Sequence, residues 1–522
     1  MKIFFALHYS DIFFKSGLLT YKSEHDIITM NYKASFKTKK QRRITIMKKY
    51  LTVILALCMV LLCFVSCGNG NTNSGDVSDS GSNPNNEEEK YLDDQDFGGY
   101  AFTFLGTSKD PGVIVQESDI DKTSILDRAK IERDEEIKKR FNIVFEEKIL
   151  SIEEHIASYV RSDSLKPTPS FDFGRVSGRE DVSEFLLSHS VADVRDIPVM
   201  DLDKPWYIQQ ANEEYTIMDR QFFVSGMYPE LVKSRPLLFN KTMLNDLNMD
   251  LPYSIILDGK WTFEEFKEYM SVGYSNLNET NNDVDALDRF GYAGHEHSIT
   301  YFYQGLGGLS TVKAANGAVI PVIGDGDSDT LYTMLKEFMD SDAAWMNSSY
   351  FDVNDSSSSH SPFYNGRAMF CSWTAVISDY TDIDSFEYGL AIYPKLDTNQ
   401  TQYYSPVQSA NLYFFPKNSE DFVKLGTIYE ALSEASYRIT YPASLQEARE
   451  RKLLVDDESV AVQKLVDQSL RFDILNNFDP VGGLSNNGFI WMCLQEEHLP
   501  SILALSWKDG WEITFESFFD GE

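Results

Sequence analysis

The sequence predicts an α/β fold with two hydrophobic cores. The first observation is a strand-like, a helix-like and another strand-like segment within 100–149, an order typical of a parallel α/β lobe. The second is a further strand followed by a helix at 237–247. The third is length: of the 522 residues, 432 follow the polar stretch 68–90, which is enough for two sizeable cores.

The first α/β zone is read from short apolar runs. YAFTFLG at 100–106 predicts a strand. Ser124 and Asp127 have the spacing of a helix cap, and a charge-rich helix is expected after them. FNIVFEEKI at 141–149 predicts a second strand, and FDFGRV at 171–176 a third that ends at a Gly/Ser turn.

The second zone contains the best-defined helix start in the chain. LLFNKTMLNDL at 237–247 predicts a strand and then a helix. Thr262 and Glu265 form a capping box, and Trp261 and Phe266 have the spacing of a hydrophobic staple. A helix is therefore expected to begin at residue 263.

The later segments continue this alternation. An Asn-Gly turn leads into a strand within 363–370, and 387–396 is a further strand. Strand, turn and helix follow at 412–422. The stretch 445–517 is expected to be helical to about residue 475, and then to form a loop and a final helix.

Charge limits the possible partners. The first 67 residues hold 11 Lys or Arg and 3 Asp or Glu, so the remainder holds 36 basic and 77 acidic residues, a formal charge of −41. Nucleic acid and anionic membrane surfaces are therefore poor partners. Cys371 and Cys493 are the cysteines beyond residue 67, and we expect two buried free thiols rather than a disulfide framework.

An export signal is expected near the N-terminus. Lys48 and Lys49 precede the apolar run 51–65, which is short for a membrane span. FVSC at 64–67 resembles a bacterial lipobox, and this resemblance implies cleavage before Cys67 and a diacylglycerol on its thiol. A transmembrane anchor and an ordinary secretory signal are the alternatives.

The segments on either side of the signal are expected to lie outside the folded part. Residues 1–46 precede a complete signal (47–66), so we expect Met47 to be the true start of translation. After the lipidated cysteine, 67–97 is a tether, because its Gly, Asn, Ser and acidic residues cannot bury enough apolar surface to fold.

Six motifs, counting the lipobox, occur in the order found in family 1 extracellular solute-binding proteins. The other five are LFNK at 238–241, WTFEEF at 261–266, FGYA at 290–293, FYNGRAM at 363–369, and YG at 388–389 with YPK at 393–395. The chain resembles this family over most of 98–515. The family captures solutes for ABC importers, so the resemblance implies a carbohydrate or oligosaccharide ligand, ABC permease subunits as partners, a monomer and no cofactor.

The resemblance also implies a periplasmic-binding-protein-like type II fold, in which crossover hinge strands join two α/β lobes around a ligand cleft. The first lobe would comprise 98–205 and 405–440, and the second 215–400 and 445–520. The protein would lie in the cell envelope, lipid-anchored on the outer face of the cytoplasmic membrane.

A sugar site needs aromatic platforms and planar polar groups, because sugars present apolar faces edged by hydroxyls. Trp373 and Trp491 resemble stacking positions of the family, although a core role is open for both. Polar contacts are expected in the turn after the third strand, where Arg179 could instead form a surface ion pair. The turn residues are Ser177, Arg179 and Glu180.

Three further places could supply ligand contacts. They are the end of the first strand, a loop with two tyrosines, and the presumed return crossover between the lobes. The candidates are Gly106, Thr107 and Ser108 in the first place, Tyr301 and Tyr303 in the second, and Ser405, Gln408 and Asn411 in the third.

Two patterns suggest metal, but neither is complete. His295 and His297 would point the same way on a strand, yet no further ligand is evident, so neutral hydrogen-bonded histidines are expected. The acidic run 325–329 resembles the start of a calcium loop but lacks its Gly and Glu, which leaves a solvated acidic loop. Residues 352–360, rich in serine, are expected to form a polar surface loop.

Two other functions remain open. An extracellular carbohydrate-active enzyme would need two carboxylates at a set separation, and the sequence shows no nucleophile elbow, HExxH motif or phosphate loop. A surface sensor could use the same fold without a permease.

Overall fold

The computed structural model places the chain from residue 91 to 518, with gaps. It describes residues 91–107, 124–151, 155–176, 179–229, 234, 236–277, 284–349, 352, 355–372, 383, 385–407, 411–450, 456–478 and 488–518. All of them belong to the unit Glu89–Glu522. The expected signal, Cys67 and most of the tether lie outside the described residues.

The first sheet has the order β14-β3-β1-β2. β1 (Tyr100–Thr107) runs parallel to β2 (Ile143–Leu150) and β3 (Phe173–Arg175), and β14 (Tyr413–Phe414) runs antiparallel to β3. The edge strand β14 therefore comes from a segment more than two hundred residues after the rest of the sheet.

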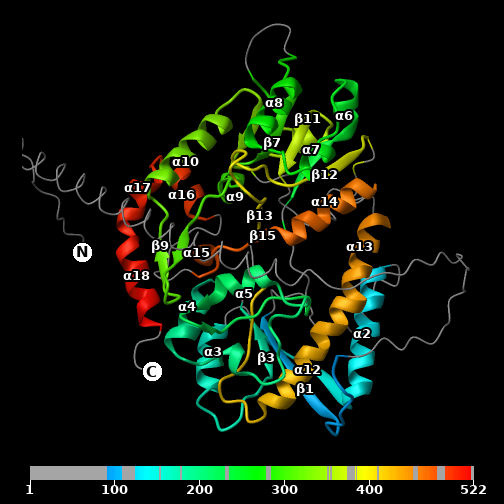
Figure 1. Ribbon diagram of the computed structural model, residues 1–522, viewed down its shortest axis with the longest axis vertical. Coiled ribbons are helices and arrows are strands. Elements are labelled where there is room, and N and C mark those ends of the chain that lie inside the picture. The colour runs from blue at the N-terminus through cyan, green and yellow to red at the C-terminus, as the bar shows by residue number, and fades with distance from the viewer. Residues whose placement is uncertain are drawn as a thin grey trace, which may run out of the picture. The chain divides into compact units, whose positions relative to one another are not determined.

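Four helices accompany this sheet, and together they form what we call lobe 1 (Figure 1). They are α2 (Ile125–Phe141), α3 (Ile156–Asp163), α4 (Arg179–Leu187) and α12 (Phe422–Ala435). Phe102, Phe104, Ile137 and Phe173 are buried in the core between strands and helices. The β2 strand starts two residues later than predicted, because α2 continues to Phe141 and ends at Asn142, whose φ is 48°.

The second sheet has the order β10-β7-β11-β6-β12. Its strands are β6 (Leu237–Asn240), β7 (Phe290–His295), β10 (Ala344–Asn347), β11 (Ala368–Ser372) and β12 (Tyr388–Ala391). β7 is parallel to β10 and β11, whereas β6 is antiparallel to both of its neighbours. Each sheet thus has a parallel group beside one reversed strand.

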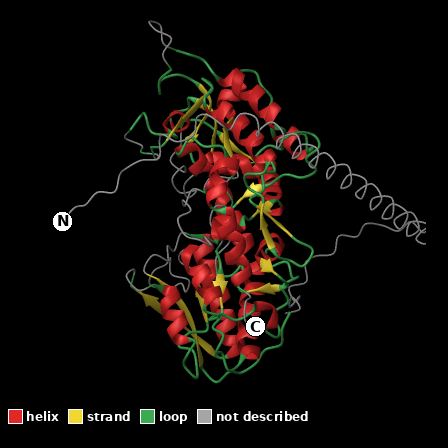
Figure 2. Ribbon diagram, turned by 90° about the vertical axis from the view of Figure 1, so that its left-hand side faces the viewer, coloured by secondary structure: helices red, strands yellow, loops and turns green. Residues whose placement is uncertain are grey.

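The helices that accompany the second sheet complete lobe 2. They are α6 (Lys241–Asp246), α7 (Tyr253–Leu257), α8 (Phe263–Gly273), α9 (Ser298–Gly305), α10 (Gly326–Met339) and α11 (Ser361–Tyr364). Figure 2 shows helices flanking the strands in both halves of the chain.

The remaining elements join or border the lobes. They are η3 (Val194–Asp196), α5 (Gln209–Tyr215), β4 (Thr216–Ile217), β5 (Arg220–Gln221), β8 (Thr311–Lys313), β9 (Val319–Pro321), β13 (Ser405–Pro406), the π-helix η5 (Ser436–Thr440), α13 (Tyr441–Glu450), α14 (Asp457–Gln468), β15 (Leu470–Arg471), α15 (Ile474–Asn477), α16 (Phe489–Gln495), α17 (Pro500–Leu503), η6 (Ala504–Ser506) and α18 (Lys508–Ser517). β13 and β15 pair in parallel, and Figure 1 shows them between the two sheets.

Both predicted helix starts are confirmed. Ser124 Oγ accepts a hydrogen bond from the Asp127 amide at 3.0 Å, and Thr262 Oγ1 accepts one from the Glu265 amide at 3.4 Å. The Trp261 ring lies edge-on to Phe266 with centroids 6.0 Å apart, as the staple requires.

The serine-rich loop differs from the prediction of a surface loop. Ser358 and Ser359 are completely buried, while the preceding residues 355–357 are exposed. The Asp352 amide donates to Ser358 Oγ at 3.1 Å, and Ser359 Oγ lies 2.7 Å from His360 Nδ1. These hydrogen bonds satisfy the buried hydroxyls, so the second half of the run can fold inward.

The acidic run 325–329 is also not a solvated loop, because it starts α10. Asp325 pairs with Lys508 at 2.7 Å, and Asp329 accepts hydrogen bonds from the amide and hydroxyl of Ser501. The acidic residues therefore attach α10 to the C-terminal helices. Within the part of the chain that the structure describes, no helix is long and apolar enough to cross a membrane.

Candidate ligand-binding site

The carboxyl edge of the lobe 1 sheet gathers polar residues from segments far apart in sequence. β1 ends at Thr107, which is buried, and β3 ends at Arg175. Tyr413 of the antiparallel β14 pairs with Arg175, so Asn411 enters the sheet at this same edge. The Arg175 Nη2 atom donates to Asn411 Oδ1 at 3.2 Å. Arg175 was missed from the sequence, since it sits inside the predicted strand.

The turn predicted to hold polar contacts follows β3 directly. α4 begins at Arg179, so Arg179 and Glu180 form its first turn, but their side chains lie outside the described part. Ser177, Ser108 and Gln408 also lie outside the described residues. Their roles stay predictions, although the backbone before and after them leads to this edge.

Ser405 lies on the link between the lobes. It begins β13, and its hydroxyl is fully buried without a hydrogen-bond partner among the described residues. A buried hydroxyl without a partner is costly, and a ligand or water oxygen would remove that cost.

The carboxyl edge of the lobe 2 sheet carries histidines. β7 ends at His295, whose Nε2 lies 2.8 Å from the Ser348 carbonyl oxygen. The amide of His297 donates to His295 Nδ1 at 3.1 Å. Because Nδ1 accepts, the ring proton must sit on Nε2 and point at the carbonyl. Burial lowers the pKa of His295, which also favours this neutral form.

A third histidine, His360, lies beside the end of the adjacent strand β11. Ser372, the last residue of β11, has its hydroxyl 3.5 Å from His360 Nε2. His360 is buried just before α11, and the His297 ring lies 4.3 Å from that of His295. Among the described residues, no group of three or more side chains has the arrangement of a metal site. The ring nitrogens of His295 and His360 thus form hydrogen bonds at this edge, whereas the expected hydrogen bonds of the His297 ring stay a prediction.

Trp491 lies on α16, close to the same edge. One helical turn later, the side-chain amide of Gln495 donates to Glu296 Oε2 at 3.1 Å, next to His295 and His297. The Trp491 ring is partly buried, and its Nε1–H is buried without a hydrogen-bond acceptor among the described residues. Trp373, which directly follows Ser372 of β11, lies outside them.

The two tyrosines of α9 are placed differently from a typical sugar platform. Tyr301 and Tyr303 are 3% and 1% exposed. The Tyr303 hydroxyl donates to Ser328 Oγ at 2.9 Å, and burial raises its pKa to about 12. Tyr301 packs edge-on against His297 with centroids 5.6 Å apart. Tyr301 thus borders the histidine edge, whereas Tyr303 faces the core.

A charged cluster holds the linking segments together. Asp473 accepts hydrogen bonds from the side-chain amide of Gln304 at 3.0 Å and from the Ser310 hydroxyl at 2.5 Å. The Ile474 amide donates to Glu214 Oε1 at 2.9 Å. Burial, and then the Asp473 carboxylate, raise the pKa of Glu214 to about 7. This cluster joins α5 to lobe 2 beside the β13–β15 pair.

Comparison with known protein families and with curated proteins found no match. Solved structures are similar in fold. A cyclo/maltodextrin-binding protein complexed with maltotetraose has 12% identity over 81% of this chain and 98% of its own, with a TM-score of 0.49. UspC of M. tuberculosis has 11% identity over 72% of this chain and 89% of its own, with a TM-score of 0.49. MalE of Listeria monocytogenes, in complex with maltose, has 13% identity over 81% of this chain and 99% of its own, with a TM-score of 0.48.

The chain has two sheets with parallel strands and helices beside them, and β14 brings a late segment of the chain into the lobe 1 sheet. The predicted two α/β lobes are thereby confirmed, whereas the type II periplasmic-binding-protein class and its ligand cleft stay predictions. Two of these solved structures contain a bound sugar, maltotetraose and maltose respectively. At such low identities they transfer no residue role, so every ligand contact named above remains a prediction. The lobe boundaries given from the sequence likewise stay predictions.

Proposed function

We propose that this chain is the substrate-binding lipoprotein of an ABC importer and that it captures an oligosaccharide. The observation that carries this proposal is the pair of polar sheet edges described above. Arg175 and Asn411 mark one edge, and His295, His360 and Trp491 mark the other. In α/β folds, ligands bind outside the carboxyl ends of parallel strands.

The chemistry of these groups suits a polyhydroxylated ligand. Arg175 offers planar donors, which can bind sugar hydroxyls. Trp491 adds an aromatic face for an apolar sugar face and a buried N–H that has no acceptor among the described residues.

In the proposed mechanism, the ligand first contacts one lobe and the second lobe then closes over it. Closure is driven by contacts that form to both edges only in the closed state. The linking segments near β13 and the π-helix η5 would absorb the change in backbone angles. The closed protein would then deliver its ligand to the permease.

We further propose that Cys67 carries the lipid anchor and that 68–90 spans the distance to the membrane. The supporting observation is the lipobox-like FVSC sequence after a basic and apolar stretch. A diacylglycerol and a third acyl chain such as palmitate would anchor the protein stably, because two or more chains exceed the marginal binding of one.

Binding rather than catalysis is proposed, because the buried acids with raised pKa values lie within structural hydrogen-bond networks. Glu214 binds the Ile474 amide, and Glu430 binds two aromatic side chains inside lobe 1. Absence of turnover of chromogenic glycosides would accord with this proposal.

Isothermal titration against maltose, maltotetraose and a wider oligosaccharide panel tests the function. Small-angle scattering should show a smaller radius of gyration in the presence of the sugar that binds. No binding across oligosaccharides, polyols and peptides would refute the proposal.

Trp491→Ala tests the site itself. We expect its affinity to fall roughly 30-fold, the effect of losing about 2 kcal/mol at an aromatic hot spot. Trp491→Phe should recover part of the loss. Trp507→Ala is the matched control, since Trp507 is also partly buried but packs at a tilt against Trp511 in the C-terminal helices. Equal losses for Trp491→Ala and Trp507→Ala would contradict the assignment.

A further inference from the structure

A hairpin of lobe 2, separate from its main sheet, contacts an element of lobe 1. The hairpin consists of β8 and β9 and leaves lobe 2 between α9 and α10. Figure 1 shows β9 extending from the region of α10 toward lobe 1. The amides of Val322 and Ile323 both donate to the Ser310 carbonyl, at 2.9 Å and 3.1 Å, and so close the base of the hairpin. The β8–β9 hairpin is therefore fixed to lobe 2.

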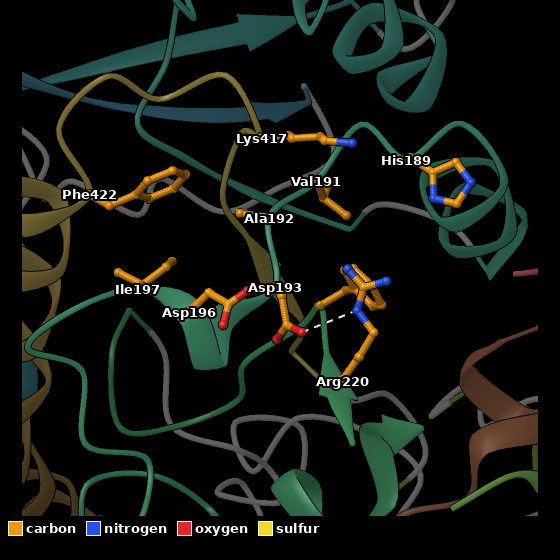
Figure 3. Close-up of a pocket in the computed structure, with 10 residues that line it drawn as sticks. His189, Val191, Ala192, Asp193, Asp196, Ile197, Arg220, Lys417 and Phe422 are labelled. Carbon is orange, nitrogen blue, oxygen red and sulfur yellow. Dashed lines mark hydrogen bonds and ion pairs between the residues drawn. The ribbon is translucent and has the colours of Figure 1, made fainter. Parts of the chain in front are cut away.

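The partner of this hairpin is a second hairpin, β4 and β5, which is fixed to lobe 1. The Arg220 Nε atom donates to Asp193 Oδ2 at 3.4 Å, the bond drawn in Figure 3. The Gln221 amide donates to Asp193 Oδ1 at 3.1 Å. Three residues after β5, Val224 forms an antiparallel bridge with Tyr413 of β14. The β4–β5 hairpin therefore moves with the lobe 1 sheet.

The tips of the two hairpins meet backbone to backbone. The Met218 amide donates to the Gly317 carbonyl at 3.1 Å. Gly317 has a φ of 79°, and a Cβ added there would lie 2.9 Å from the Met218 nitrogen and 3.0 Å from its Cα. Met218 and Asp219 both have positive φ, as in a tight two-residue hairpin turn. The contact therefore requires glycine at 317 for its backbone conformation and for its space.

A lysine of the same lobe 2 hairpin binds the end of α5. Lys313 Nζ donates to the carbonyl oxygens of Glu213 and Thr216, the second at 2.6 Å. Carbonyl groups in the last turn of a helix lack intrahelical donors, and a cation there also interacts favourably with the helix dipole. α5 leads directly into β4, so Lys313 and Gly317 hold one continuous stretch of the chain.

These contacts join the two lobes at a place where the chain does not cross between them. A hinge rotation moves each lobe as a unit about the linking segments, so a contact fixed to both lobes has to shift or break as the lobes turn. The free energy of such a contact stabilises the arrangement in which it forms. A ligand that favours another arrangement must overcome that free energy.

We propose that the contact between the β8–β9 and β4–β5 hairpins, made by Lys313, Gly317 and Met218, is a latch that opposes closure of the lobes over a ligand. This proposal rests on the proposed function, because closure is the motion that the latch restrains. The latch limits the fraction of protein that is closed before the ligand binds, so weakening it raises the apparent affinity for the ligand.

A distance measurement between the lobes tests the latch without any ligand. Spin labels at Leu165→Cys in lobe 1 and Leu287→Cys in lobe 2 report the arrangement of the lobes, since both positions are exposed (85% and 60%). Cys371 and Cys493 are buried, so they should not react with the label. Pulsed electron paramagnetic resonance should give one narrow distance distribution for this pair. Gly317→Ala should add a second population, because the new Cβ forces the hairpins apart.

Gly259→Ala is the matched control. Gly259 lies in lobe 2 with a φ of 72°, and a Cβ added there has no atom within 4 Å. Alanine therefore brings similar backbone strain at this position but disturbs no contact, and the distance distribution should stay as narrow as before. A single narrow distribution in Gly317→Ala, or an equal second population in Gly259→Ala, would overturn the proposal.

Titration with maltotetraose then tests the link to binding. Lys313→Gln should bind maltotetraose about fivefold more tightly than the native protein, because the latch loses the hydrogen bonds of one exposed cation. Lys336→Gln is the control, since Lys336 is also an exposed lysine of lobe 2 but pairs with Asp340 one turn later. Equal or weaker binding by Lys313→Gln would refute the proposal. If neither maltotetraose nor the wider panel binds the native protein, the proposed function fails, while the distance measurement still decides whether the latch exists.

Discussion

Glu430 in α12 should make lobe 1 less stable as the pH rises. Its carboxylate is completely buried and accepts hydrogen bonds from Trp206 Nε1 at 3.1 Å and the Tyr207 hydroxyl at 2.5 Å. Burial raises its pKa to about 7, above the usual value of 4.5. The folded state therefore holds the proton more tightly than the unfolded state does.

The sign and size follow from proton linkage. The stabilisation is complete below about pH 4.5 and is lost as the pH rises through about 7. Each pKa unit corresponds to about 1.4 kcal/mol, and integration between pH 5 and pH 8 gives a loss of about 2.5 kcal/mol from Glu430.

The assay is urea unfolding of the native protein and of Glu430→Gln at pH 5 and pH 8. At pH 5 the variant should be about 1 kcal/mol less stable than the native protein, because its amide has one acceptor oxygen instead of two. At pH 8 it should be about 1.5 kcal/mol more stable than the native protein. It should also lack the additional pH-dependent loss of about 2.5 kcal/mol. Glu420→Gln, at an exposed glutamate of the same lobe, serves as the control. Parallel pH profiles for Glu430→Gln and the native protein would refute the reasoning.

Three further outcomes are expected. Gly291→Ala should lower the free energy of unfolding by about 1–3 kcal/mol in urea titrations, because its Cβ would overlap the Met270 backbone; a change below 0.5 kcal/mol would contradict this contact. Thr262→Ala should lower the free energy of unfolding by about 1 kcal/mol, because the α8 cap is lost. Thermal unfolding would detect this loss as a lower Tm, and an unchanged Tm would exclude the cap's contribution. Cys371 and Cys493 are free and buried, as predicted. Alkylation followed by mass spectrometry should therefore label both thiols in urea without reductant and neither thiol in the native state. A disulfide-linked peptide would contradict this.

Local features of the fold could be predicted from sequence because their causes are local. The caps at Ser124 and Thr262 depend on residues within four positions, and both were found where expected. The change from strand to helix predicted within 237–247 is also found, with Asn240 as the helix cap. The Asn365–Gly366 turn is similar, since Gly366 has a φ of 71°. The presence of these helices, strands and turns could thus be predicted from short stretches of sequence.

The candidate site was less predictable because it depends on distant segments. Arg175 becomes a site candidate only when β14 brings Asn411 beside it, and no short pattern shows that pairing. The burial of His360 likewise depends on Ser372 of a neighbouring strand. Ser358 was expected at the surface because its run is polar, yet hydrogen bonds to Asp352 let it be buried.

The late arrival of β14 has a consequence for biosynthesis. A ribosome has produced every strand of the lobe 2 sheet once it passes Ala391, but lobe 1 still lacks β14 and α12 at that moment. Phe173 and Ile137 must wait for Tyr413 and Leu432 before their core is complete. During synthesis or export the half made first is therefore finished last, and truncation before residue 435 should leave it an exposed target for chaperones and proteases.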